Sequence, residues 1–143
     1  MIKRILVAID GSTQSYKAFD FALEITNACK AGFELYALSV VPPTEAAYFV
    51  QTDAPMEAAI REYKGILKKL EEKAGQRNLK LATEVLVGHP AETIVKFATE
   101  KKCDLIVMGH RGMSKIEDLF LGSVSNRVVS TAHCAVTIVK WPV

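Results

Sequence analysis

The chain has 143 residues, of which 50% are hydrophobic and 24% charged; its 18 lysines and arginines and 16 aspartates and glutamates give a formal net charge of +2. This length is typical of one domain that buries a core without disulfide or metal support, so we expect a single domain over residues 1–143. Charges of both signs are interspersed, and they interrupt every apolar stretch before a membrane span could form. We therefore expect neither nucleic-acid nor membrane binding.

The cysteines are three in number, and none lies in a C-x-x-C spacing. An odd number without such spacing predicts reduced, buried thiols at Cys29, Cys103 and Cys134, and with them a cytoplasmic location. A redox sensor is the alternative, but no cluster of basic residues marks any of the three as an activated thiol.

Hydrophobic periodicity along the chain predicts alternating strands and helices. The apolar run at residues 5–9 predicts a strand covered on both faces, and Ser12 or Thr13 is positioned to cap the helix that follows. In chain order we expect strands at 5–9, 35–41, 80–87, 104–109 and 135–140, separated by helices at 13–31, 56–75, 90–102 and 123–132. Parallel neighbours need crossover connections, so this order predicts an α/β fold with an open, doubly wound, five-stranded parallel sheet and helices on both faces.

Two loops at the carboxyl ends of strands hold the candidate site. Ligands of open α/β sheets bind where successive connections leave the first strand on opposite sides, here after the first and fourth strands. The first loop begins at Asp10, which could hold a metal ion, contact a ligand directly or cap the first helix.

The loop after the fourth strand begins with Gly109-His-Arg-Gly112. Nine residues then separate Gly112 from Gly122, which lies at the start of a predicted helix. Glycines admit a close approach of the backbone, and a helix N-terminus offers free N–H groups to an anion. Arg111 adds a cationic fork, and Ser123 and Ser125 add hydroxyl donors. The pattern therefore predicts a phosphate cradle, with a glycine-rich turn before a serine-capped helix as the alternative. It is neither a P-loop nor a dinucleotide fingerprint.

With these motifs the sequence resembles the universal stress protein family over nearly its whole length. The similar segments are Ile5-Leu-Val-Ala-Ile-Asp-Gly-Ser12, Val87-Gly-His-Pro-Ala-Glu-Thr-Ile94, Asp104-Leu-Ile-Val-Met-Gly109 and the spacing Gly109-x2-Gly112-x9-Gly122-Ser123. That spacing is the pattern of the family's ATP-binding branch. The resemblance implies an adenine nucleotide alpha hydrolase-like fold with strand order 3-2-1-4-5, and ATP, with or without Mg or Mn, between the ends of the first and fourth strands. The nucleotide contacts that it implies are Ala8, Ile9, Asp10, Val40, Met108, Gly109, Arg111, Gly112, Gly122, Ser123, Val124 and Ser125, with Asp10 as the possible metal ligand.

The apolar last strand predicts that the chain pairs with a second copy of itself. Its apolar residues would form a sheet edge, and such edges are usually covered or paired. We therefore expect a homodimer in which Val136, Thr137, Ile138 and Val139 pair with their copies in a second chain, as the resemblance also implies.

Together these features predict an ATP-binding stress or signalling switch. No obvious water-activating base lies in the phosphate loops, so hydrolysis should be slow or absent. Two alternatives stay open: an enzyme that uses an adenine nucleotide, as an ATPase or by adenylation, and a structural or interaction dimer without a nucleotide. A phospho-receiver domain is disfavoured, because it needs an acceptor aspartate where this chain has Val87 and Gly88.

Overall fold

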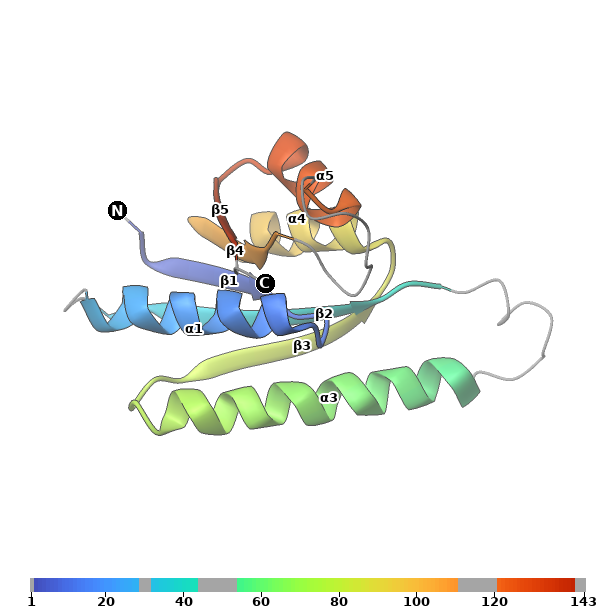
Figure 1. Ribbon diagram of the computed structural model, residues 1–143, viewed down its shortest axis with the longest axis horizontal. Helices are drawn as coiled ribbons and strands as arrows, with labels where there is room; N and C mark the ends of the chain where they lie inside the picture. The colour runs from blue at the N-terminus through green and yellow to red at the C-terminus, as the bar shows by residue number, and fades with distance from the viewer. Residues whose placement is uncertain (1, 29–31, 44–53, 111–120, 141–143) are drawn as a thin grey trace.

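The computed structural model describes residues 2–28, 32–43, 54–110 and 121–140 (Figure 1). All strand pairs are parallel, and the sheet order is β3-β2-β1-β4-β5, which confirms the predicted topology. The elements are β1 (Arg4–Ala8), α1 (Thr13–Ala28), β2 (Glu34–Val41), α3 (Ala54–Gly75), β3 (Leu81–Val87), α4 (Pro90–Glu100), β4 (Leu105–Gly109), α5 (Ser123–Thr131) and β5 (Ala135–Val139). None of the helices in this part of the chain is long and apolar enough to cross a membrane.

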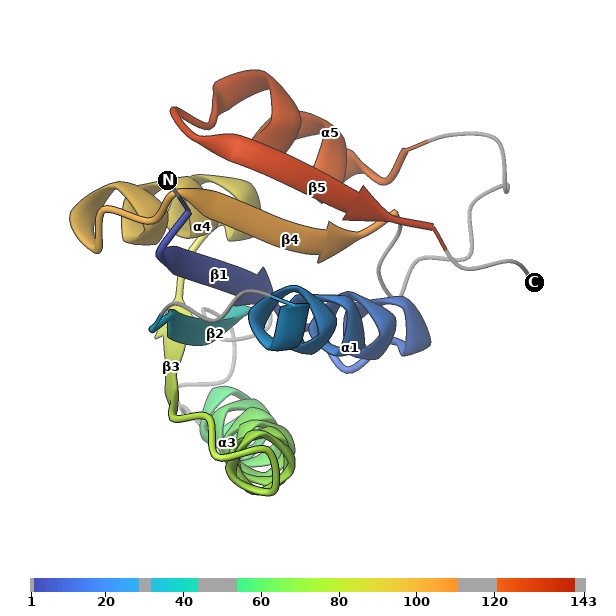
Figure 2. The ribbon, with the colours of Figure 1, turned by 90° about the vertical axis from the view of Figure 1, so that its left-hand side faces the viewer.

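Helices cover the sheet on both faces, as predicted. Helices α1 and α3 pack on one face, while α4 and α5 pack on the other (Figures 1 and 2). Alternate residues of the central strand β1 enter the two cores: Ile5 and Val7 pack with α1 and α3, while Leu6 packs with α4 and α5. This two-sided burial explains why the strand is a continuous apolar run.

The amino edge of the sheet is tied by Asp104, immediately before β4. Its Oδ2 accepts hydrogen bonds of 2.9 Å from the backbone N–H groups of both Lys3 and Arg4. These two bonds hold the pKa of the Asp104 carboxyl below its usual value. Beside it, Cys103 is buried, and desolvation raises the pKa of its thiol to about 11. The predicted burial of this cysteine is confirmed; Cys134 is only half-buried, and Cys29 lies outside the described residues.

Element boundaries differ from the sequence expectation by at most two residues; the first helix begins at Thr13 as expected, and its expected end at residue 31 lies outside the described residues. The strand expected at 5–9 ends at Ala8; beyond it the Ile9 N–H still donates to the Leu38 carbonyl, while the Ile9 carbonyl accepts a hydrogen bond from the side chain of Ser39. The first helix begins after Ser12, whose Oγ accepts the Ser15 N–H at 3.1 Å. Ser12, one of the two predicted caps, is therefore the N-cap.

Candidate functional site at the carboxyl edge of the sheet

The turn between β1 and α1 is ordered by its own side chains. Asp10 Oδ1 accepts the backbone N–H of Ser12 at 2.9 Å and also the Ser12 hydroxyl. This supports the helix-start interpretation of Asp10, because its carboxylate holds the N-cap residue in place. No three His, Cys, Asp or Glu side chains within the described ranges are grouped so as to hold a metal ion. A cation at Asp10 would therefore take its other ligands from a bound molecule, water or undescribed residues, and the metal role stays a prediction.

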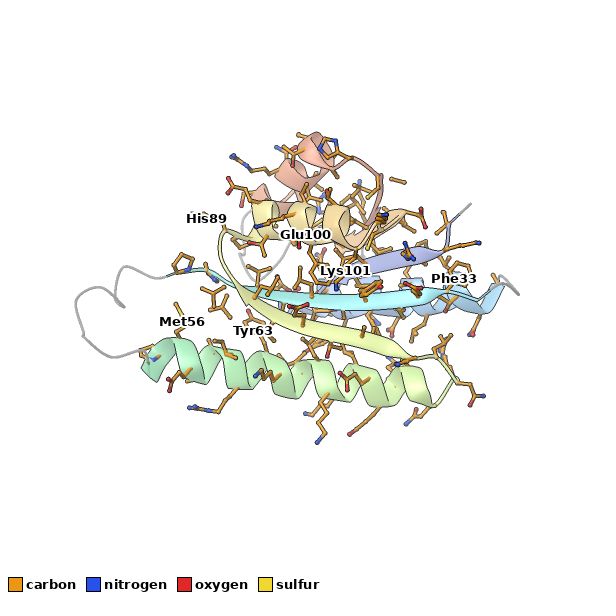
Figure 3. All side chains as sticks on the ribbon, turned by 180° about the vertical axis from the view of Figure 1, so that it is seen from behind. Phe33, Met56, Tyr63, His89, Glu100 and Lys101 are labelled. Carbon is orange, nitrogen blue, oxygen red and sulfur yellow. The ribbon has the colours of Figure 1, made fainter. Side chains whose placement is uncertain are left out.

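Helix α3, which packs on the same face of the sheet as α1, contacts this turn. The Tyr63 hydroxyl donates to the Asp10 carbonyl at 3.4 Å, and Ile66, one turn along, has Cδ1 3.5 Å from where a side-chain Cβ on Gly11 would lie. Gly11 has φ +83°, a conformation that favours glycine. Figure 3 shows Met56 and Tyr63 on the side of α3 that faces the sheet. Burial, with a contribution from the Asp10 charge, raises the pKa of Tyr63.

The end of β2 presents a backbone donor and acceptor beyond β1. The Leu38 carbonyl accepts the Ile9 N–H on the β1 side, and the Val41 carbonyl accepts the Gly88 N–H on the β3 side. Backbone groups point alternately to the two neighbours of a strand, so the N–H and C=O of Val40 point toward β1, past the point where it ends. No residue in the described segments pairs with either group.

The end of β4 is packed tightly against α1. A Cβ on Gly109 would lie 2.9 Å from Cβ of Gln14 and 3.0 Å from its carbonyl carbon. The sequence interpretation assigned this glycine to close approach of a ligand, whereas here it allows close approach of the first turn of α1. Ser125, which is buried, donates its hydroxyl to the Gly109 carbonyl at 2.9 Å. That proton is therefore not free for an anion, contrary to the expected hydroxyl role of Ser125.

The start of α5 nevertheless leaves donors available. Gly122 is the N-cap and has no side-chain cap; its own N–H donates to the His110 carbonyl at 2.9 Å. The next three N–H groups, of Ser123, Val124 and Ser125, have no acceptor in the described part of the chain. Free N–H groups at the positive end of a helix attract an anion.

Ten of the twelve predicted contacts are described, and all lie at the carboxyl edge. Ala8 ends β1 and is followed by Ile9 and Asp10; Val40 is near the end of β2; Met108 and Gly109 end β4; and Gly122 caps α5, which begins with Ser123, Val124 and Ser125. Arg111 and Gly112 lie outside the described residues. The side chains of Ile9 and Met108 are buried in the two cores, which leaves their backbone as the part available to a ligand.

Three residues that shape this edge were not among the predicted contacts: Gln14, Ser39 and Tyr63. Only Ser39 leaves a signal in the sequence, as a polar residue within an otherwise apolar strand. The roles of the other two depend on tertiary contacts that local periodicity does not encode.

Comparison with known proteins decides the family. The model of the "Universal stress protein family" matches residues 1–140. The chain belongs to the universal stress protein family. Its relatives include the universal stress protein MJ0531 of Methanocaldococcus jannaschii, which is 38% identical over 99% of this chain and 84% of that protein.

Solved universal stress protein structures share the fold. The universal stress protein UspA from Lactobacillus plantarum is 28% identical with a TM-score of 0.85, and the match covers 96% of this chain and 97% of that one. A universal stress protein in complex with cAMP is also 28% identical, with a TM-score of 0.68 and 97% of both chains covered. These comparisons confirm the expected adenine nucleotide alpha hydrolase-like architecture.

Proposed function

We propose that this protein is a cytoplasmic ATP-binding switch of the universal stress protein family. The observation that carries the proposal is the N–H and C=O of Val40, which have no partner among the described residues and point into the space beyond the end of β1. An adenine base presents a ring nitrogen that accepts and an amino group that donates, side by side, so one residue's backbone pair can bind both. The cAMP complex of a relative supports an adenine nucleotide as the ligand class.

The start of α5 would bind the phosphates. Its three available N–H groups lie beyond the end of β4, to which the bond between Ser125 and Gly109 attaches the helix. Arg111 and Gly112 would complete the cradle, as the motif predicts. Magnesium or manganese bound to the phosphates would take Asp10 as its protein ligand, because a carboxylate is a ligand that these hard cations prefer.

Hydrolysis is proposed to be slow or absent, so that occupancy of the site carries the signal. Phosphoryl transfer needs a positioned nucleophile as well as charge stabilisation. Asp10, the carboxylate at this edge, already accepts two hydrogen bonds through Oδ1. These bonds engage the Asp10 carboxylate in holding the turn that starts α1, rather than in positioning a water molecule. Turnover that is lost in Asp10→Ala would instead favour an enzyme.

Purified protein provides the direct test. We expect reversed-phase analysis to find an adenine nucleotide released on denaturation, and calorimetry to measure ATP binding in the presence of magnesium or manganese. The Gly122→Val, Ser123→Ala double variant should lose binding, since it places bulk against the helix N-terminus. Ser130→Ala, at the other end of α5 where the hydroxyl donates to the Asn126 carbonyl, is the matched control and should bind normally. Wild-type protein that is empty and binds no added ATP would refute the proposal.

The proposal includes a homodimer formed through β5. The His110 N–H donates to the Val139 carbonyl, so alternation turns the backbone groups of Val136 and Ile138 away from β4, toward the free edge. We expect a mass in solution of twice the 15.7 kDa chain. Val136→Pro removes one edge donor without touching a β4 rung and should weaken the dimer, whereas Val136→Ala keeps that donor and should not. A strictly monomeric wild-type protein would contradict the dimer.

A further inference from the structure

Ser39 is an unusual residue for its position. It lies inside β2 toward the carboxyl end, is fully buried, and is flanked by Leu38 and Val40. Its Oγ donates to the carbonyl of Ile9 at 2.7 Å, across to the neighbouring chain segment. A buried hydroxyl inside a strand requires a partner, and here the partner is a backbone carbonyl that a sheet normally pairs with another strand.

The hydroxyl occupies the place of a ladder bond. The Ile9 N–H donates to the Leu38 carbonyl at 2.9 Å, so the next rung of a parallel ladder would run from the Val40 N–H to the Ile9 carbonyl. That rung is absent from the described hydrogen bonds, and the β1–β2 register stops at Ala8 opposite Leu38. Ser39 therefore stabilises an opened end of the ladder, in which the Ile9 carbonyl is paired and the Val40 N–H has no acceptor within the described segments.

We propose that Ser39 is a positioning residue that keeps the Val40 N–H available to a purine base by taking the Ile9 carbonyl itself. This inference rests on the proposed nucleotide function and adds the residue that prepares the base-binding edge. Without the hydroxyl, the Ile9 carbonyl would lose its partner and would accept a hydrogen bond from the Val40 N–H, which extends the β1–β2 ladder by one bond. The base would then compete with a backbone bond for the same donor.

Amide hydrogen exchange in the nucleotide-free protein tests the geometry without any ligand. In the wild type the Val40 amide should exchange fast for a residue inside a sheet, and in Ser39→Ala it should slow by about tenfold or more as the rung forms. Thr26→Val is the matched control, because it also removes one buried hydroxyl, bonded to the Leu23 carbonyl at the far end of α1. A Val40 amide already protected in the wild type, or equally fast in Ser39→Ala, would overturn the inference.

Base discrimination tests the consequence for binding. Guanine carries an acceptor where adenine carries its amino donor, so GTP gains little from Val40 and reports the contribution of the phosphates. In Ser39→Ala we expect ATP affinity to fall about three- to tenfold, the contribution of one neutral hydrogen bond, while GTP affinity stays constant. General destabilisation would lower both affinities together, and Thr26→Val should leave their ratio unchanged.

The outcomes separate the two ideas. A wild type that binds ATP, with the same ATP-to-GTP ratio in Ser39→Ala, would overturn the role of Ser39 and leave nucleotide binding standing. A wild type that binds neither nucleotide, with a fast Val40 amide, would refute the proposed function and the assignment of a purine, although the opened ladder would stand. A ratio that falls in Ser39→Ala, with a slowed Val40 amide, supports both.

Discussion

Replacing Gly109 by alanine tests how tightly β4 packs against α1. The added Cβ would lie 2.9 Å from Gln14 Cβ, 3.0 Å from its carbonyl carbon and 3.1 Å from its carbonyl oxygen. Carbon atoms in contact prefer about 3.5–4.0 Å, so the first turn of α1 would have to move by more than about half an ångström. Two of the three contacts are backbone atoms, and no change of side-chain rotamer removes them.

The expected cost follows from two opposing terms. Overpacking of a core costs about 1–3 kcal/mol, while replacing glycine by alanine recovers about 0.4–1 kcal/mol by restricting the unfolded chain. Gly109 is not among the described residues with positive φ, so no backbone strain adds to this. We therefore expect Gly109→Ala to lower the free energy of unfolding by about 1–2 kcal/mol.

Urea unfolding followed by circular dichroism measures this change. The midpoint should fall by roughly 0.5–1 M with an unchanged m-value. Gly65→Ala is the matched control: nothing lies within 4 Å of its added Cβ on α3, and alanine is the better helix former, so its midpoint should rise. A Gly109→Ala midpoint equal to or above that of the wild type would refute the packing argument.

Three further predictions concern the described residues. Asp104→Asn should be less stable than wild type at pH 7, and the difference in the free energy of unfolding should shrink as the pH falls below about 4. The pKa of Asp104 is depressed in the folded protein, so its stabilising effect is complete above the ordinary carboxyl pKa and is lost when the folded form is protonated. A gap that stays constant in urea titrations between pH 7 and pH 3 would contradict this. Burial raises the pKa of the Cys103 thiol to about 11, so at pH 8 it should react with iodoacetamide at least about 100-fold more slowly in the folded protein than in urea. Peptide mass spectrometry measures both rates, and equal rates would argue against the burial of Cys103. Ser12→Ala should lower the free energy of unfolding, measured in urea, by about 1 kcal/mol and Ser12→Gly by less; an unchanged stability in Ser12→Ala would show that Ser12 does not cap α1.

The sheet was predictable because each element has a strong local signal. Buried parallel strands are short apolar runs, and helices repeat their apolar residues every three or four positions, so the alternation of elements predicted a parallel, doubly wound sheet. The strand order itself was implied by the resemblance to the universal stress protein family. Residue type also narrowed the helix cap to Ser12 or Thr13, and the structure places it at Ser12.

The details of the site were less accessible from the sequence. Gly109 and Ser125 were correctly placed at the carboxyl edge, but their assigned chemistry differs: Gly109 admits the backbone of α1, and Ser125 gives its hydroxyl to Gly109. Ser39 serves a carbonyl 30 residues earlier, and the Tyr63 hydroxyl reaches one 53 residues earlier. Such pairings arise from which strand and helix lie side by side, and residue spacing cannot reveal them.

The two ends of the sheet have different consequences for handling the protein. Asp104 holds the backbone of Lys3 and Arg4 at the amino ends of the strands, whereas the candidate site lies at their carboxyl ends. Val139, by contrast, lies beside Gly109 at the carboxyl edge, and its carbonyl bonds His110. A purification tag or fluorophore joined before β1 therefore leaves the candidate site clear, whereas one joined after β5 starts beside both that site and the free sheet edge. Binding and mass measurements should use the former.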